Sequence, residues 1–143
     1  MTQSRHPNRQ QGRFAEKHVA DRFDLEHTPD ETNWFDAVNP RTGTKVEVKS
    51  TTDEIVGRDG TMVPGEFRLW RDQHRSLLAS DTRGTAWYAF VLLDDDGHVL
   101  EVQRRRPSTV TDVIDEWVTG GHDERDGPQA KVPWPLVLDI TLD

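Results

Sequence analysis

The hexapeptide KVEVKS, residues 45–50, alternates polar and apolar side chains. Successive side chains of a strand point to opposite faces, so both valines share one face and Lys45, Glu47 and Lys49 share the other. The pattern predicts a strand with one face in the core. Its polar face is either an ordinary solvated surface or the site of a reaction.

A hairpin is predicted around this strand. The run NWFDAV (residues 33–38) precedes it, and the loop of residues 39–44 contains a proline and a glycine, which suit a tight turn. If the loop is symmetric, three pairs face each other: Val38 and Lys45, Ala37 and Val46, Asp36 and Glu47. The core face then carries Phe35, Ala37, Val46 and Val48, and the polar face carries Asp36, Glu47 and Lys49.

The opposition of Asp36 and Glu47 is a local conflict, because like charges directly across two strands destabilise a sheet. Conflicts of this kind tend to occur at functional sites. A hard divalent cation resolves this one, since two carboxylates, waters and a backbone carbonyl suit octahedral Mg²⁺. Lys49 projects from the same face and can orient a water or neutralise charge on a phosphate. The set predicts metal-assisted phosphodiester hydrolysis, whereas Glu-x-Lys alone would be a common solvated ion pair.

A helix is expected over residues 9–24, after a loose start in residues 1–8. Ala15, Val19 and Phe23 form its apolar stripe, with Gly12 and Ala20 on the same side. Glu16 falls inside this stripe. A carboxylate there is either paired or bound to a metal, or it lies at the edge of the stripe and reaches solvent.

The region after the hairpin begins with a polar segment, residues 51–65, that contains a turn. A short strand with Phe67 and Leu69 follows, and a helix is expected from Trp70 onward. This helix places Gln73 at the margin of its apolar stripe, and it makes His74 a core-edge histidine rather than a ligand. The apolar run of residues 85–93 is typical of a strand that is covered on both faces.

The C-terminal part is predicted to contain a hairpin, a helix and an extended tail. Residues 94–97 turn the chain into a strand at 98–103, and their aspartates are interpreted as a solvated turn because no EF-hand calcium spacing follows. A helix is expected over residues 110–118, ended by Gly120 and Gly121. Residues 122–130 are expected to form an exposed loop, and residues 132–140 a sheet edge or an extended packed segment, given their prolines. The order of elements predicts an α/β fold with a mixed β-sheet flanked by helices, in one domain of residues 1–143 with its core over 9–93 and the C-terminal elements over 94–143.

Composition narrows the class of protein. The 143 residues include no cysteine, which excludes disulfides, zinc–thiolate sites and iron–sulfur clusters. Neither a membrane span nor a secretory leader is expected. The net charge is −8 and only four of the 18 basic residues are lysine. Such a composition is typical of proteins from a cytoplasm with molar salt, of haloarchaeal or halovirus origin, or else of an ordinary acidic cytoplasmic protein. At about 1 M salt the Debye length is roughly 3 Å, so the acidity does not exclude nucleic acid as a partner.

The motif and the elements around it resemble the PD-(D/E)xK nuclease superfamily, which has the restriction-endonuclease-like fold. The resemblance rests on Asp36-x10-Glu47-x-Lys49 in a hairpin, after a helix with GRFAE and before a helix with RDQH. It implies that Asp36 and Glu47 bind Mg²⁺ or Mn²⁺, that Val48 lends its backbone carbonyl, and that Lys49 is the catalytic lysine. Glu16 matches the first-helix glutamate that several branches add to the metal shell, and Gln73 matches the helix glutamine that some branches use near the site. One departure is Phe35, which stands where the family name has proline.

The same resemblance implies a DNA endonuclease without an organic cofactor. The compact layout is similar to that of archaeal and phage Holliday junction resolvases, which act on branched DNA as homodimers. Candidate phosphate contacts are Arg13, Arg68 and Arg71, together with Arg41 and Arg58; alternatively, these arginines are solvated surface residues. The run of residues 104–106 is weak evidence for a basic patch. The alternative function is a non-catalytic nucleic-acid-binding or adaptor domain of the same fold.

Overall fold

The computed structural model describes residues 6–28, 34–119 and 127–140, with side chains from residue 10 onward. In chain order its elements are α1 (His6–Arg22), β1 (Glu26–His27), β2 (Ala37–Val38), β3 (Lys45–Thr52), β4 (Glu54–Val56), β5 (Met62–Pro64), β6 (Glu66–Trp70), α2 (Arg71–Asp81), β7 (Ala86–Leu93), β8 (Val99–Arg105), α3 (Pro107–Thr111), β9 (Gln129–Pro133) and a 3-10 turn (Trp134–Leu136). No helix in these ranges is long and apolar enough to cross a membrane.

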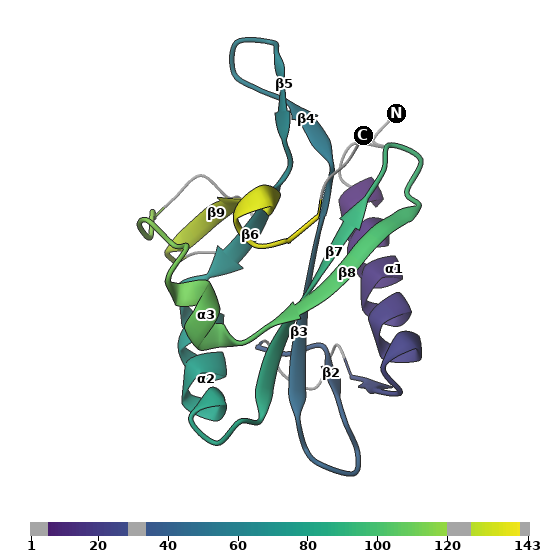
Figure 1. Cartoon of the computed structure of the whole chain (residues 1–143), viewed down its shortest axis with the longest axis vertical. Helices are drawn as coiled ribbons and strands as arrows, with labels where there is room; N and C mark the ends of the chain where they lie inside the picture. Colours follow the sequence, from purple (N-terminus) through teal and green to yellow (C-terminus); the bar gives the residue numbers. More distant parts are fainter. Residues whose placement is uncertain (1–5, 29–33, 120–126, 141–143) are drawn as a thin grey trace.

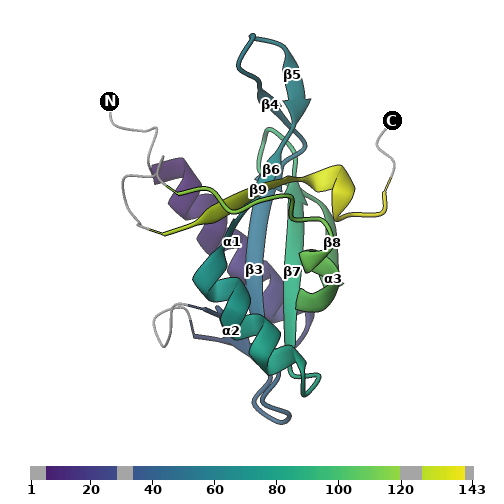
Figure 2. The ribbon, with the colours of Figure 1, turned by 90° about the vertical axis from the view of Figure 1, so that its left-hand side faces the viewer.

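The central sheet has the strand order β1-β2-β3-β7-β8. Strands β3 and β7 are parallel and the other neighbours are antiparallel, so the predicted mixed sheet is confirmed. Helix α1 covers one face, and α2, α3 and the β6–β9 pair lie on the other, as Figures 1 and 2 show. The fold is the predicted α/β arrangement.

Two apolar cores hold these layers together, one on each face of the sheet. The core between α1 and the sheet contains Ala15, Val19, Val46, Val48, Ala89, Val91, Leu93 and Val102. The larger core, on the other face, includes Phe67, Leu69, Leu77, Tyr88, Phe90, Leu92, Val110, Val132 and Trp134. Strand β7 contributes to both, because its alternate side chains enter opposite faces, which confirms the strand predicted from the apolar run of residues 85–93.

The hairpin of β2 and β3 has the predicted register, with Ala37 opposite Val46 and Val38 opposite Lys45. The first strand is shorter than expected, since β2 covers residues 37–38 only. Asp36 precedes β2, but its N–H still donates to the Val46 carbonyl at 2.9 Å. The strand β3 is longer than its motif and continues to Thr52. Residue 33 lies outside the described residues.

Helix α1 starts earlier than predicted. It begins at His6, so residues 6–8 are helical and the expected loose start is wrong for them; residues 1–5 lie outside the described part. Pro7 is compatible with this start, because the N–H groups of a first helical turn have no partner within the helix. The helix ends at Arg22, close to the expected end, and Asp24 takes a left-handed conformation with φ 54°. Aspartate tolerates this conformation better than most residues.

The middle of the chain follows the prediction and adds one hairpin. Strand β6 buries Phe67 and Leu69 completely, and α2 follows with Trp70 as its N-cap residue. Between β3 and β6, β4 and β5 form a hairpin that projects from the body of the molecule (Figures 1 and 2). This hairpin contains the turn expected in residues 51–65, with Gly60 at φ 86°.

The C-terminal part differs most from the prediction. Helix α3 covers residues 107–111 rather than 110–118. Pro107 favours a helix start at its own position, whereas the β-branched Val113 and Ile114 have low helix propensity and pack on the larger core instead. Gly120 and Gly121, the expected helix end, lie outside the described residues.

The expected exposed loop of residues 122–130 is wrong at its end. Gln129 and Ala130 are buried in β9, which pairs antiparallel with β6; residues 122–126 lie outside the described part. Ala130 is buried because β9 pairs with β6, and its polar neighbours in the sequence give no indication of this burial. The expected sheet edge is confirmed for Val132 and Pro133, which end β9 in a two-stranded sheet, whereas Trp134–Leu136 form the 3-10 turn.

Candidate active site

Asp36 lies at the end of β2 and is held by three backbone contacts. Its carboxylate oxygen Oδ2 accepts the N–H of Val48 at 2.9 Å. Its own N–H donates to Val46, and its carbonyl accepts the N–H of Thr28 at 2.8 Å. The side chain is therefore fixed against the middle of β3 rather than free in solvent.

Glu47 is buried, with 4% of its surface exposed. Burial raises the pKa of this carboxyl group well above its ordinary value of 4.5, and the charge of Asp36 and a hydrogen bond to Asp36 raise it further. The ammonium group of Lys49, 3.1 Å from Oε2, acts in the opposite direction. Asp36 and Glu47 thus form the close carboxyl pair that the hairpin register predicts.

Lys49 is fixed between two partners. Besides its ion pair with Glu47, its Nζ donates to Oε1 of Gln73 at 3.0 Å. Gln73 lies in the first turn of α2 and is buried. Strand β3 and helix α2 therefore meet at this lysine, and the polar face of residues 45–50 is mostly enclosed rather than solvated.

Glu16 approaches the same site from α1. Its Oε1 lies 2.7 Å from Nε2 of His27 and 3.9 Å from a guanidinium nitrogen of Arg13. Burial raises the pKa of the Glu16 carboxyl, and the charge of Asp36 raises it further. The sequence left open whether Glu16 is paired or reaches solvent from the edge of the helix stripe, and the structure shows it paired with His27. Glu16 is also close enough to Asp36 for the two charges to interact.

His27 is a member of the site that sequence reasoning missed. It belongs to the two-residue strand β1, where it pairs with Ala37. So short a strand leaves no hydrophobic period in the sequence. The one available signal was the need of a half-buried Glu16 for a partner.

The carbonyl of Val48 points to the same side as Asp36. Lys45 donates its N–H to the β7 side of β3, and backbone groups alternate sides along a strand, so those of Val46 and Val48 point toward β2. The bonds of both residues to Asp36 agree with this. Because the β2–β3 ladder ends at Val46, the Val48 carbonyl lies beyond the end of β2.

These donors fit a hard divalent cation. Two carboxylates in close contact and a carbonyl on the same side are the oxygen ligands that Mg²⁺ and Mn²⁺ prefer. Burial, and then the charge of Asp36, raise the pKa of the Glu47 carboxyl, and a bound cation would relieve the repulsion between the two carboxyl groups. Glu16 of α1 adds a third carboxyl group close to Asp36.

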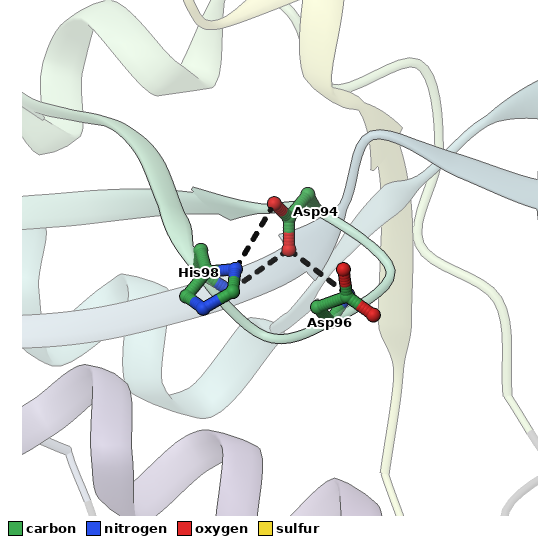
Figure 3. Close-up of side chains that lie close together, drawn as sticks. All are labelled: Asp94, Asp96 and His98. Carbon is green, nitrogen blue, oxygen red and sulfur yellow. Dashed lines mark hydrogen bonds and ion pairs between the residues drawn. The ribbon is translucent and has the colours of Figure 1, made fainter.

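A second acidic group lies far from this site, at the β7–β8 turn. Figure 3 shows Asp94, Asp96 and His98, whose ligand atoms lie within 4.8 Å of one another, the one such group of three in the described ranges. Asp94 accepts the N–H groups of Asp96 and His98, each at 2.9 Å. The bond from His98 is the main reason why the pKa of Asp94 is lowered. The expected hairpin turn is confirmed, and hydrogen bonds within it account for the arrangement of the three side chains.

The candidate phosphate contacts fall into two groups. Arg13 lies beside Glu16, Arg68 is half-buried in β6, and Arg71 is the first residue of α2, two positions before Gln73. Arg41 and Arg58 belong to the β2–β3 and β4–β5 turns, which lie at opposite ends of the molecule (Figure 1). The run of residues 104–106 stacks in part on aromatic rings, with Arg106 4.0 Å from the centre of the Trp87 ring.

His74 is a core histidine, as predicted. It is 3% exposed, and its two ring nitrogens lie 2.8 Å from the hydroxyl groups of Tyr88 and Thr111. Burial lowers its pKa to about 4, so the ring is neutral at physiological pH.

A mixed sheet covered by helices on both faces, with paired carboxyl groups and a lysine beside the parallel strands, defines the restriction-endonuclease-like class of fold. The family model of the PD-(D/E)XK nuclease superfamily domain matches residues 1–139. The chain therefore belongs to the PD-(D/E)XK nuclease superfamily, which indicates nuclease activity. No curated protein matches the chain.

Proposed function

We propose that the protein is a DNA endonuclease that depends on Mg²⁺ or Mn²⁺. The observation that carries the proposal is the contact of buried Glu47 with Asp36, next to a lysine that is fixed by Gln73. A solvated surface has no need to bury one carboxyl group in contact with another. A non-catalytic adaptor has no need of this pair either, since the contact destabilises the fold.

The residues of the site would divide the work as follows. Asp36, Glu47 and the Val48 carbonyl would hold the cation, and Glu16 would complete or position this metal shell from α1. The bound cation supplies a Lewis acid for the phosphate and lowers the pKa of an attacking water. Lys49, with its Nζ kept in place by Gln73, would orient that water or neutralise the charge that develops on the phosphate.

The finer form of the proposal concerns the substrate. The resemblance to Holliday junction resolvases leads us to propose branched DNA as a preferred substrate and a homodimer as the active form. The acidic, lysine-poor composition leads us to propose activity in high salt. Both follow from the sequence and are tested together with the activity.

The test is a cleavage assay with linear duplex, single-stranded, flap and four-way-junction DNA. Each DNA is incubated at low and at molar KCl with Mg²⁺, Mn²⁺ or EDTA. We expect cleavage with either metal and none with EDTA. We expect Asp36→Ala, Glu47→Ala and Lys49→Ala to lose cleavage but to remain folded, as a cooperative thermal unfolding transition would show. Glu54→Ala, on the exposed face of β4, is the matched control and should cleave like the parent.

Calorimetric titration with Mn²⁺ separates the nuclease from the adaptor. We expect binding by the parent that Asp36→Ala abolishes, whereas an adaptor would show no binding that depends on Asp36. A Glu47→Ala protein that cleaves DNA as fast as the parent would refute the site.

A further inference from the structure

A polar pocket lies beyond the candidate active site along β3. It has a volume of about 480 Å³, and its lining includes Gln11, Ser50, Thr52, Glu66, Arg68 and Lys131. Ser50 is two residues beyond Val48 on the same strand, which is roughly 7 Å. Gln11 of α1 reaches Ser50 with a 3.4 Å hydrogen bond, so α1 forms one wall, and the β6–β9 pair forms another.

Two cations oppose each other in this wall. Arg68 of β6 pairs with Lys131 of β9 in the antiparallel register, which places their Cβ atoms about 4.5–5.5 Å apart. Their neighbours Phe67 and Leu69 are buried in the core, so both charged side chains point to the other face, into the pocket. Like charges in this position destabilise the pair of strands.

Arg68 also carries a buried hydrogen-bond donor without an acceptor. Its Nε is shielded from solvent, and within the described residues it has no hydrogen-bond partner. A charged donor left in this state destabilises a protein, and such a donor is a sign of a missing ligand. One anion in the pocket would satisfy this N–H and relieve the repulsion between Arg68 and Lys131.

The charge of the pocket selects the kind of anion. Arg68 and Lys131 contribute two positive charges and Glu66 contributes one negative charge, which leaves a net charge of +1. A backbone phosphodiester carries a single negative charge and matches this, whereas a phosphate monoester carries about −1.5 to −2 at pH 7. The position next to the active site along β3 suits the same DNA strand.

We propose that the Arg68–Lys131 pocket binds a backbone phosphodiester of the substrate DNA adjacent to the one that is cleaved. The inference rests on the proposed function for the identity of the ligand, and it assigns a role to Lys131, which no sequence motif singles out. The pocket positions the strand and carries no base specificity, because it contacts the backbone.

The experiment measures binding without catalysis. A fluorescein-labelled DNA duplex is titrated in EDTA by fluorescence anisotropy, at salt concentrations between about 0.05 and 0.2 M. We expect Arg68→Gln and Lys131→Gln each to weaken binding and to reduce the slope of log affinity against log salt by about one. Glu66→Gln is expected to tighten binding. Arg83→Gln is the control, since Arg83 is exposed at the far end of β7, and it should bind like the parent.

Thermal unfolding of the same variants tests whether Arg68 and Lys131 repel each other in the protein without DNA. Because the substitution removes a repulsion, Arg68→Gln or Lys131→Gln should unfold at the temperature of the parent or higher while binding DNA more weakly. A purely structural role would instead lower the unfolding temperature and leave the salt slope unchanged, and that result would overturn the inference.

The outcomes distinguish this inference from the proposed function. Cleavage by the parent, together with unchanged binding and salt slope in both single variants, overturns the pocket and leaves the nuclease. Loss of binding in the variants of a protein that cleaves no DNA with any metal supports the pocket and refutes the nuclease. Displacement of the DNA by millimolar inorganic phosphate at constant ionic strength would assign the pocket to free phosphate and overturn the inference.

Discussion

The carboxylate of Asp36 accepts the backbone N–H of Val48 at 2.9 Å. Val48 stands between Glu47 and Lys49 in β3, so this bond fixes the position of Asp36 relative to both. The hydrogen bond replaces a ladder bond that β2 would have made if it had started earlier. The end of a short strand thereby becomes a rigid support for an acidic side chain.

Replacement of Glu47 by glutamine is expected to abolish cleavage and to stabilise the fold at pH 8. Burial first, and Asp36 second, raise the pKa of Glu47 in the folded protein, while the unfolded chain has the ordinary value of 4.5. The folded state therefore binds more protons above pH 4.5, and this group makes stability fall as the pH rises toward the folded pKa. Glutamine removes that dependence.

Thermal unfolding in EDTA at pH 5 and pH 8 measures this effect. The difference in unfolding temperature between Glu47→Gln and the parent should be larger at pH 8. Glu54→Gln, on the exposed face of β4, should follow the parent at both values. A variant that is less stable than the parent at pH 8 would contradict the raised pKa.

Gln73 is expected to position Lys49 rather than to react. Its Oε1 accepts the Lys49 ammonium at 3.0 Å, so Gln73→Leu should lower kcat by about 10- to 100-fold with little change in KM, because a misplaced catalytic group affects the transition state more than binding. Gln73→Glu keeps an acceptor at the same place and should restore much of the rate. Equal losses in both variants would show that Gln73 has another role.

The sequence predicts the part of the site that depends on strand periodicity. The alternation of residues 45–50 and a symmetric loop are enough to place Asp36 against Glu47, because a register is fixed once one face must enter the core. Lys49 follows from the same period. Gln73 follows from the stripe of a helix, although the contact itself depends on the crossing of α2 over β3.

Other contacts of the site and of the pocket could not be predicted, because no local sequence pattern indicates them. His27 reaches Glu16 from a strand of two residues, and Lys131 opposes Arg68 through a pairing of residues more than sixty positions apart. Such contacts are set by the tertiary fold and leave no period in the sequence. The helix expected over residues 110–118 fails for a related reason, since packing of Val113 and Ile114 on the core outweighs a weak helical pattern.

Substitution of Gly65 by alanine is expected to destabilise the protein strongly. A Cβ atom at this position would lie 1.9 Å from the backbone carbonyl oxygen of Thr52, so the strand ends at β3 and β6 would have to separate. Gly12→Ala is the matched control, because a Cβ there meets nothing within 4 Å and alanine is preferred in a helix by about 1 kcal/mol. Chemical denaturation should show a loss for Gly65→Ala and a small gain for Gly12→Ala. A neutral Gly65→Ala would mean that this close approach is absent in solution.

His74 is expected to make the protein acid-sensitive. Burial lowers its folded pKa from 6.5 to about 4. The unfolded chain therefore takes up the proton first, and the contribution of a neutral His74 is present above pH 6.5 and is lost as the pH falls toward 4, for a total of about 3 kcal/mol.

Denaturation curves from pH 7 to pH 4.5 should show a smaller loss of stability for His74→Gln than for the parent. The variant nevertheless starts from a lower stability, because it disturbs the bonds to Tyr88 and Thr111. His98→Gln provides the comparison, since that side chain is 77% exposed in the β7–β8 turn and should leave the slope unchanged. Parallel pH profiles for His74→Gln and the parent would mean that another group carries the acid sensitivity.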